Sequence, residues 1–122
     1  MTMDYGTGVT QMGDAAISSA NGARLQLVDM GMSSTQGLLS KNLIVKVGIT
    51  PMIGQNDIKT EIFTLPDAQK VLAFAKQNAW VGLLSFWMIQ RDNSIKSSNL
   101  DTSSNYPQEH LAFSKAFVQF EN

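Results

Sequence analysis

The chain has 122 residues, 43% of them hydrophobic, which is enough for one compact domain and too few for two ordinary ones. Its formal net charge of -1 provides no basic surface for nucleic acid or for an anionic membrane. The sequence has no cysteine and one histidine, which excludes disulfides, thiolate metal sites and histidine clusters. No apolar run approaches the roughly 20 residues that a helix needs to cross a bilayer.

The first predicted element is a short strand over residues 1–6, which starts apolar and ends in Asp4, Tyr5 and Gly6. An apolar run that ends in polar groups is typical of a buried parallel strand whose carboxyl end reaches a functional surface. A small, flexible loop follows over residues 6–12. Helical spacing of alanines and aliphatic residues then predicts a helix from Asp14 to Leu27, in which Gly22 favours a kink.

The next predicted strand covers residues 43–53, after a segment rich in Ser, Gly and Thr, and residues 58–63 form a loop or a short extended segment. A helix should begin directly afterwards. Thr64, Pro66 and Asp67 form an N-terminal capping signature, and the apolar residues that follow recur with helical spacing as far as Asn78.

The third predicted strand covers residues 81–87 and ends at Trp87, whereas Trp80 comes before it and is expected to pack internally. Residues 93–105 are rich in Ser, Asn and Asp and are predicted to form a surface loop. A closing helix is expected over residues 108–120, with a stripe of apolar side chains that comprises Phe113, Ala116, Phe117 and Phe120.

The alternation of three strands with three helices predicts an α/β fold with parallel strands and right-handed crossovers, as in part of a β/α barrel. Six elements are too few to close a barrel of eight strands. Three strands with helices on one side leave an open edge and an uncovered sheet face. We therefore expect the partner of this sheet to be further N-terminal barrel strands or a second copy of the chain.

Three motifs in this order resemble the C-terminal part of bacterial and archaeal glycoside hydrolase family 18 chitinases. They are Met1–Gly6, the stretch Gly48–Gly54 with Asn56-Asp57, and Trp87 followed by Arg91-Asp92-Asn93. The resemblance covers nearly the whole chain, including the closing helix. It implies that residues 1–122 are the last three βα units, strands six to eight, of a (β/α)8 barrel.

The resemblance implies a chitinase-type activity on β-1,4-linked N-acetylglucosamine polymers by a retaining, substrate-assisted mechanism. In this family a glutamic acid that closes a D-x-x-D-x-D-x-E motif protonates the leaving oxygen. Of Glu61, Glu109 and Glu121, none closes such a motif. We therefore assign no catalytic residue and expect the 122-residue chain alone to be inactive, so that its share is the wall of the substrate cleft.

The resemblance makes Trp87 the floor of the sugar site on the non-reducing side of the scissile bond, because an indole face packs well on a pyranose ring. The alternative is a core tryptophan. Asp4 matches the aspartate of the sixth-strand motif, Met3 stands where that motif usually has tyrosine, and Tyr5 comes one position later. Asp57 is either a cleft residue or a turn aspartate, and Asp4 is either a substrate contact or a buried structural carboxylate.

Arg91 and Asp92 are expected to brace the loop of Trp87 without touching sugar, as an ion pair if they are exposed. The seven methionines lie on separate elements and indicate core packing, so that neither a metal nor any other cofactor is predicted. Two alternatives stay open: a non-catalytic carbohydrate-binding remnant, and an unrelated small three-layer α/β domain. The family is typically secreted and the first residues show no signal peptide, so we assign no location.

Overall fold

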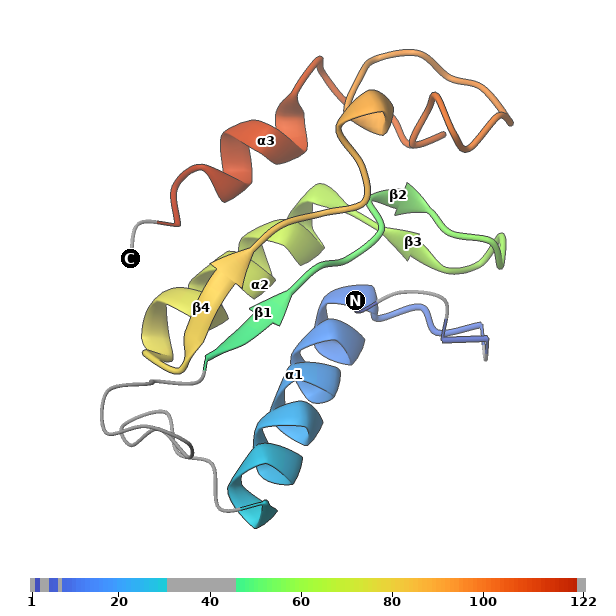
Figure 1. The fold of residues 1–122 in the computed structure, drawn as a ribbon. Coiled ribbons are helices and arrows are strands. Elements are labelled where there is room, and N and C mark those ends of the chain that lie inside the picture. The colour runs from blue at the N-terminus through green and yellow to red at the C-terminus, as the bar shows by residue number, and fades with distance from the viewer. Residues whose placement is uncertain (1, 3–4, 7, 31–45, 121–122) are drawn as a thin grey trace.

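The chain contains both helices and strands in the computed structural model, which describes residues 2, 5–6, 8–30 and 46–120 (Figure 1). The elements in chain order are α1 (Met12–Asp29), β1 (Val47–Ile49), β2 (Gly54–Gln55), β3 (Ile62–Phe63), α2 (Leu65–Gln77), β4 (Val81–Leu84), the 3-10 turn η1 (Ile89–Arg91) and α3 (Ala112–Phe117). Met1, Met3, Asp4 and the start of the predicted second strand lie outside the described residues.

The strands β1 and β4 run parallel, with Val47 opposite Val81 and Ile49 opposite Leu84. Beyond them, isolated parallel bridges join Thr2 to Pro51 and Met52 to Trp87. Thr2 also donates its backbone N–H to the carbonyl of Thr50 at 2.9 Å. The stretch that begins with β1 is therefore central, between Thr2 and the β4 stretch. The predicted parallel α/β arrangement is confirmed, and the sheet that these residues form is open and does not close into a barrel.

The core lies between this sheet and the helices. In Figure 1, α2 runs behind β1 and β4, with α1 on one side of the strands and α3 on the other. The buried side chains come from every layer, and they include Met12, Ala16, Ile49, Phe63, Val71, Val81, Phe113 and Ala116. Trp80 is also buried, with its ring edge-on to Phe74 at 5.6 Å, which confirms its predicted packing role.

Helix α2 begins with the predicted capping box. Asp67 donates its backbone N–H to the side-chain oxygen of Thr64, and the Asp67 carboxylate accepts the backbone N–H of Thr64 at 2.8 Å. The same carboxylate also accepts the backbone N–H of Gly13 at 2.9 Å, in the first turn of α1. One aspartate thus accepts a backbone N–H at the start of each of two helices, and α1 needs this because Gln11 provides no side-chain cap.

Helix α1 is continuous from Met12 to Asp29, so that Gly22 does not break it. The buried face of α1 explains this result. Met12, Ala16 and Ala20 are buried against the core, and this packing offsets the roughly 1 kcal/mol by which a glycine weakens a helix. None of the helices in the described part of the chain combines the length and the apolarity that crossing a membrane requires.

The strands β2 and β3 form an antiparallel hairpin, with Gly54 opposite Phe63 and Gln55 opposite Ile62. The hairpin projects past the end of β1 (Figure 1). Gly54 has a φ of +70° and lies so close to the 93–105 loop that an added Cβ would be 2.2 Å from the carbonyl oxygen of Ser104. Only glycine fits there, because both the conformation and the space exclude a side chain.

Candidate functional site

Trp87 lies at the carboxyl end of the β4 stretch with 43% of its side chain exposed. Its backbone is fixed on both sides: its N–H donates to Pro51 at 2.8 Å, and its carbonyl accepts the N–H of Ile53 at 3.0 Å. The peptide bond between Trp87 and Met88 is cis. A rigid sheet therefore holds an indole ring that solvent can reach.

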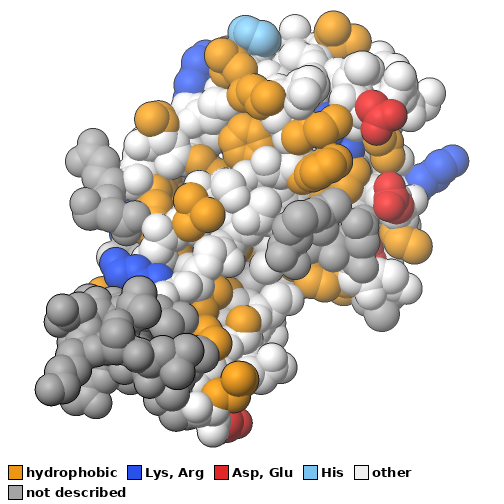
Figure 2. Space-filling model, in the orientation of Figure 1, with side chains coloured by type: hydrophobic (Ala, Val, Ile, Leu, Met, Phe, Trp, Pro, Cys, Tyr) orange, Lys and Arg blue, Asp and Glu red, His pale blue; other side chains and the backbone are white. Residues whose placement is uncertain are grey.

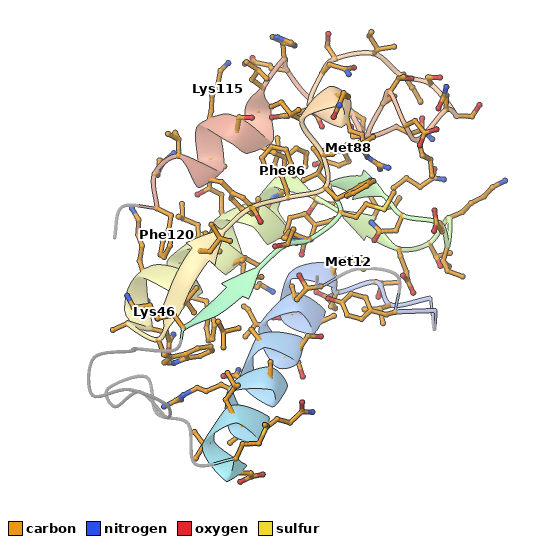
Figure 3. All side chains as sticks on the ribbon, in the orientation of Figure 1. Met12, Lys46, Phe86, Met88, Lys115 and Phe120 are labelled. Atoms are coloured by element: carbon orange, nitrogen blue, oxygen red, sulfur yellow. The ribbon has the colours of Figure 1, made fainter. Side chains whose placement is uncertain are left out.

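The side chain before Trp87 points the other way. Phe86 packs edge-on against Phe117 of α3, with ring centroids 5.9 Å apart. Figure 3 shows Phe86 between the end of β4 and α3, and Met88 just beyond it toward η1. Because side chains alternate along a strand, Trp87 belongs to the face opposite the helices.

This helix-free face of the sheet carries Leu83, Thr50 and Ser85 as well as Trp87. Leu83 is 55% exposed and would contact a side chain placed at Gly48, directly across the strands. The hydroxyls of Thr50 and Ser85 are hydrogen-bonded at 2.7 Å. In the view of Figure 2, hydrophobic side chains reach the surface across the middle of the molecule, whereas most charged side chains lie toward its rim. The face therefore offers apolar surface with a few hydroxyl groups.

Arg91 braces the loop that follows Trp87. It is fully buried, and its guanidinium donates to the backbone carbonyls of Ile53 at 2.9 Å, Gln55 at 2.5 Å and Leu100 at 2.8 Å. These bonds tie the end of the central strand and β2 to the 93–105 loop. The predicted bracing role of Arg91 is confirmed. Arg91 is buried, however, whereas the ion pair with Asp92 that we considered from the sequence was an exposed one.

Asp92 is also fully buried, and its carboxylate caps α3. It accepts the backbone N–H groups of Phe113 at 3.1 Å and Ser114 at 2.8 Å, and the amide of Gln108 at 2.7 Å. The cap fixes the start of the helix at Ala112, after Leu111, whose φ is +58°. Helix α3 is therefore shorter than the predicted helix over residues 108–120, although the apolar side chains Phe113, Ala116 and Phe117 are buried as expected.

Tyr5 points toward the helix layer. Its ring packs against the core, and its hydroxyl is buried near the hydroxyls of Ser19 and Thr2 without a hydrogen bond of standard geometry. Burial raises the pKa of this phenol, the two hydroxyls partly offset the rise, and the Glu61 carboxylate adds to it. A sugar on the helix-free face would not reach the Tyr5 hydroxyl.

Asp57 is exposed in the turn of the β2–β3 hairpin, and its predicted contact with a sugar stays a prediction. Met3 and Asp4 lie outside the described residues, so their predicted roles stay predictions.

Glu61 is a fully buried residue that the sequence analysis left without a structural role. Its carboxylate accepts the backbone N–H groups of Tyr5 at 3.2 Å and Gly8 at 3.0 Å. The sequence carries no signal for this contact, because Glu61 stands in a polar turn and its partners are backbone groups more than 50 positions away.

No group of three or more histidine, aspartate or glutamate side chains lies together as metal ligands would among the residues that the structure describes. A hollow of about 650 Å3 opens at the opposite end of the strands from Trp87, between Lys46, Lys76, Asn78 and Phe120. Figure 3 shows Lys46 and Phe120 at that end and Met88 at the other. This hollow is therefore separate from the exposed indole.

The sequence of this chain is similar to parts of known chitinases. The chain is 31% identical over 97 residues to Endochitinase 11 of Metarhizium anisopliae and, over the same length, to a probable bifunctional chitinase/lysozyme of Escherichia coli K12. The matched region is 75% of this chain, but only 18% and 11% of those two proteins. No protein-family model matches the chain.

Solved structures agree with these sequence matches. The fold superposes with a TM-score of 0.77 and 34% identity on the catalytic domain of a hyperthermophilic chitinase from Pyrococcus furiosus, over 98% of this chain and 38% of that chain. Catalytic-site mutants of the active domain 2 of this chitinase, crystallised with chito-oligosaccharides, match equally well. The chain spans well under two thirds of the proteins that it matches.

Proposed function

We propose that this chain, a homologue of part of chitinase catalytic domains, belongs to glycoside hydrolase family 18 and forms one wall of a chitin-binding cleft. The observation that carries the proposal is the half-exposed indole of Trp87, which a parallel sheet holds at its carboxyl end. In β/α barrels this end of the strands carries the active site. The substrate class follows from the related Pyrococcus domain, which was crystallised with chito-oligosaccharides.

In the proposed mechanism, the indole face of Trp87 packs on the apolar face of an N-acetylglucosamine unit and sets the position of its anomeric carbon. The acetamido oxygen of the sugar attacks that carbon while a glutamic acid protonates the leaving oxygen. Water then attacks the same carbon of the cyclic intermediate from the face that the leaving group occupied, so that two inversions retain the configuration overall. The sequence of this chain has no D-x-x-D-x-D-x-E motif to provide that acid. Catalysis by this route therefore requires the motif from another segment.

Four other residues are proposed to line the cleft wall, and the observations that support them differ from residue to residue. Asp4 and Met3 rest on their match to the sixth-strand motif. Tyr5 would contribute only through the accessible part of its ring, since its hydroxyl is buried. Asp57 would meet a sugar only where an extended chain reaches the hairpin turn.

Replacing Trp87 with alanine should weaken the binding of N-acetylchitohexaose by about tenfold or more, because a central aromatic contact carries a large share of binding energy. Trp87→Phe should keep part of the affinity. Titration calorimetry on the 122-residue chain measures both. The matched control is Trp80→Phe, which changes a buried tryptophan away from this face and should leave the affinity unchanged. Equal affinities for Trp87→Ala and the original chain would contradict the proposal.

The chain by itself should leave a chromogenic chitobioside intact. If the pure chain hydrolysed this substrate, and Trp87→Ala abolished the hydrolysis, the assignment of the acid to another segment would be contradicted.

Further barrel strands are the proposed source of that acid and of the missing sheet partner. They would pack along the edge strand β4 and the adjoining groove of about 390 Å3, which Phe86, Ile89, Phe117 and Val118 line. A second copy is the alternative partner, which sedimentation velocity would detect as a dimer.

A non-catalytic carbohydrate-binding remnant is the second candidate function, because an exposed indole and no general-acid motif are what such a remnant would retain. Both candidates predict sugar binding that depends on Trp87. They differ when the chain is co-expressed with a separate polypeptide that carries the D-x-x-D-x-D-x-E motif and the preceding strands of a related chitinase. Hydrolysis in that mixture favours the catalytic function, and binding without hydrolysis favours the remnant.

A further inference from the structure

The buried carboxylate of Glu61 holds two residues near the N-terminus, Tyr5 and Gly8. Glu61 belongs to the turn that connects β2 and β3, and its own backbone is fixed there: its N–H donates to Ile58 at 2.9 Å and its carbonyl accepts the N–H of Asn56 at 2.8 Å. The carboxylate is therefore presented from a rigid position. Its two oxygens meet the backbone of Tyr5 and Gly8.

The two carboxylate oxygens take separate donors. One accepts the backbone N–H of Tyr5 at 3.2 Å and the other that of Gly8 at 3.0 Å. Gly6 and Gly8 both have positive φ, at +71° and +68°, which lets the segment curl so that two N–H groups converge on one anion. Hydrogen bonds to a charged acceptor are about twice as strong as those between neutral groups.

The contact joins residues near the N-terminus to the β2–β3 hairpin. Thr2 pairs with the central strand at Pro51, and Tyr5 is held by Glu61, so the described residues on either side of positions 3 and 4 are both fixed to the rest of the sheet. Met52, one residue beyond Pro51, is bridged to Trp87. The residues that Glu61 holds and the exposed Trp87 are thus attached to the same sheet. We call the contact of Glu61 with Tyr5 and Gly8 the Glu61 anchor.

We infer that Glu61 is a positioning residue for the sugar-binding wall: its buried carboxylate fixes Tyr5 and Gly8 relative to the sheet that holds Trp87. The inference rests on the proposed function and adds a residue that touches no sugar itself. It requires both oxygens and the negative charge of the side chain. Gln keeps the shape and only one acceptor, and its NH2 group would face a backbone N–H.

The test compares Glu61→Gln with Glu109→Gln, which removes the same charge at an exposed position where the nearest cation, Lys115, is 3.9 Å away. Amide hydrogen exchange measured by NMR on the full chain should rise roughly ten- to a hundredfold at Tyr5 or Gly8 in Glu61→Gln. No change is expected in Glu109→Gln. Titration with N-acetylchitohexaose should then show a roughly three- to tenfold loss of affinity in Glu61→Gln alone.

The outcomes separate the two proposals. Unchanged exchange at both amides in a folded Glu61→Gln variant overturns the anchor, and increased exchange with unchanged affinity overturns its role in the sugar site. Absence of binding by the original chain overturns the proposed function, and the anchor is then judged by exchange alone. If Glu61→Gln does not fold, Glu61→Asp keeps the charge on a side chain one methylene shorter, and it should release one of the two amides in the same measurement.

Discussion

Replacing Arg91 with methionine should lower the free energy of unfolding by about 3 kcal/mol, because one buried and two partly buried backbone carbonyls lose their donor. Those carbonyls belong to Ile53 and Gln55 on one segment and to Leu100 on another, more than 40 positions later in the chain. Methionine fills most of the volume and donates nothing. Urea unfolding followed by circular dichroism measures the change.

Arg91→Lys tests whether charge alone explains the effect. An ammonium group on a shorter stem cannot reach three carbonyls as a planar guanidinium does, so this variant should also be strongly destabilised. Lys115→Met is the matched control, since Lys115 is exposed on α3 and its loss should change stability by less than about 0.5 kcal/mol. Full stability in Arg91→Lys would show that the hydrogen-bond pattern is not what holds the loop.

Gly54→Ala should lower the free energy of unfolding by about 2–5 kcal/mol, from two effects that add. A non-glycine residue in the left-handed region costs about 1–2 kcal/mol, and forcing a methyl group into a packed site costs about 1–3 kcal/mol. The added Cβ would lie 2.2 Å from the Ser104 oxygen and 2.5 Å from the Ser104 Cβ, so the 93–105 loop would have to move. Because Arg91 donates a hydrogen bond to Leu100 in that loop, the change should weaken binding of N-acetylchitohexaose as well.

Gly22→Ala is the matched control for this substitution. An added Cβ at Gly22 meets nothing within 4 Å, and the residue lies in the interior of α1. Alanine there should stabilise the protein by about 0.5–1 kcal/mol through helix propensity. Thermal unfolding of the two variants should therefore shift the midpoint in opposite directions. A Gly54→Ala protein as stable as the original would mean that the loop accommodates the methyl group.

The sequence was informative where a local rule decides the structure. The capping signature at Thr64 and Asp67 predicted the start of α2, because its donors and acceptors lie within one turn. The apolar runs predicted the parallel strands, and the residue Trp80 was correctly assigned to internal packing. The chitinase relationship that the motifs indicated is also supported by the comparisons.

The sequence was least informative where a polar side chain is buried by a distant segment. Arg91 and Asp92 stand next to a Ser/Asn-rich loop, which favours an exposed interpretation, yet both are fully buried because Leu100 and α3 lie over them. The β2–β3 hairpin was missed for a related reason. Each strand has two residues, which is too short for an alternating pattern, and Gly54 against Ser104 sets its geometry.

The shared aspartate of the two helix starts makes α1 dependent on α2. The first turn of α1 obtains its cap from Asp67, 54 positions later in the chain, and an added Cβ at Gly13 would lie 2.8 Å from that carboxylate. The cap exists only once the segments that separate the two helices have brought them together. An excised α1 peptide would fray at its N-terminus, and in the protein the two helices should melt as one cooperative unit.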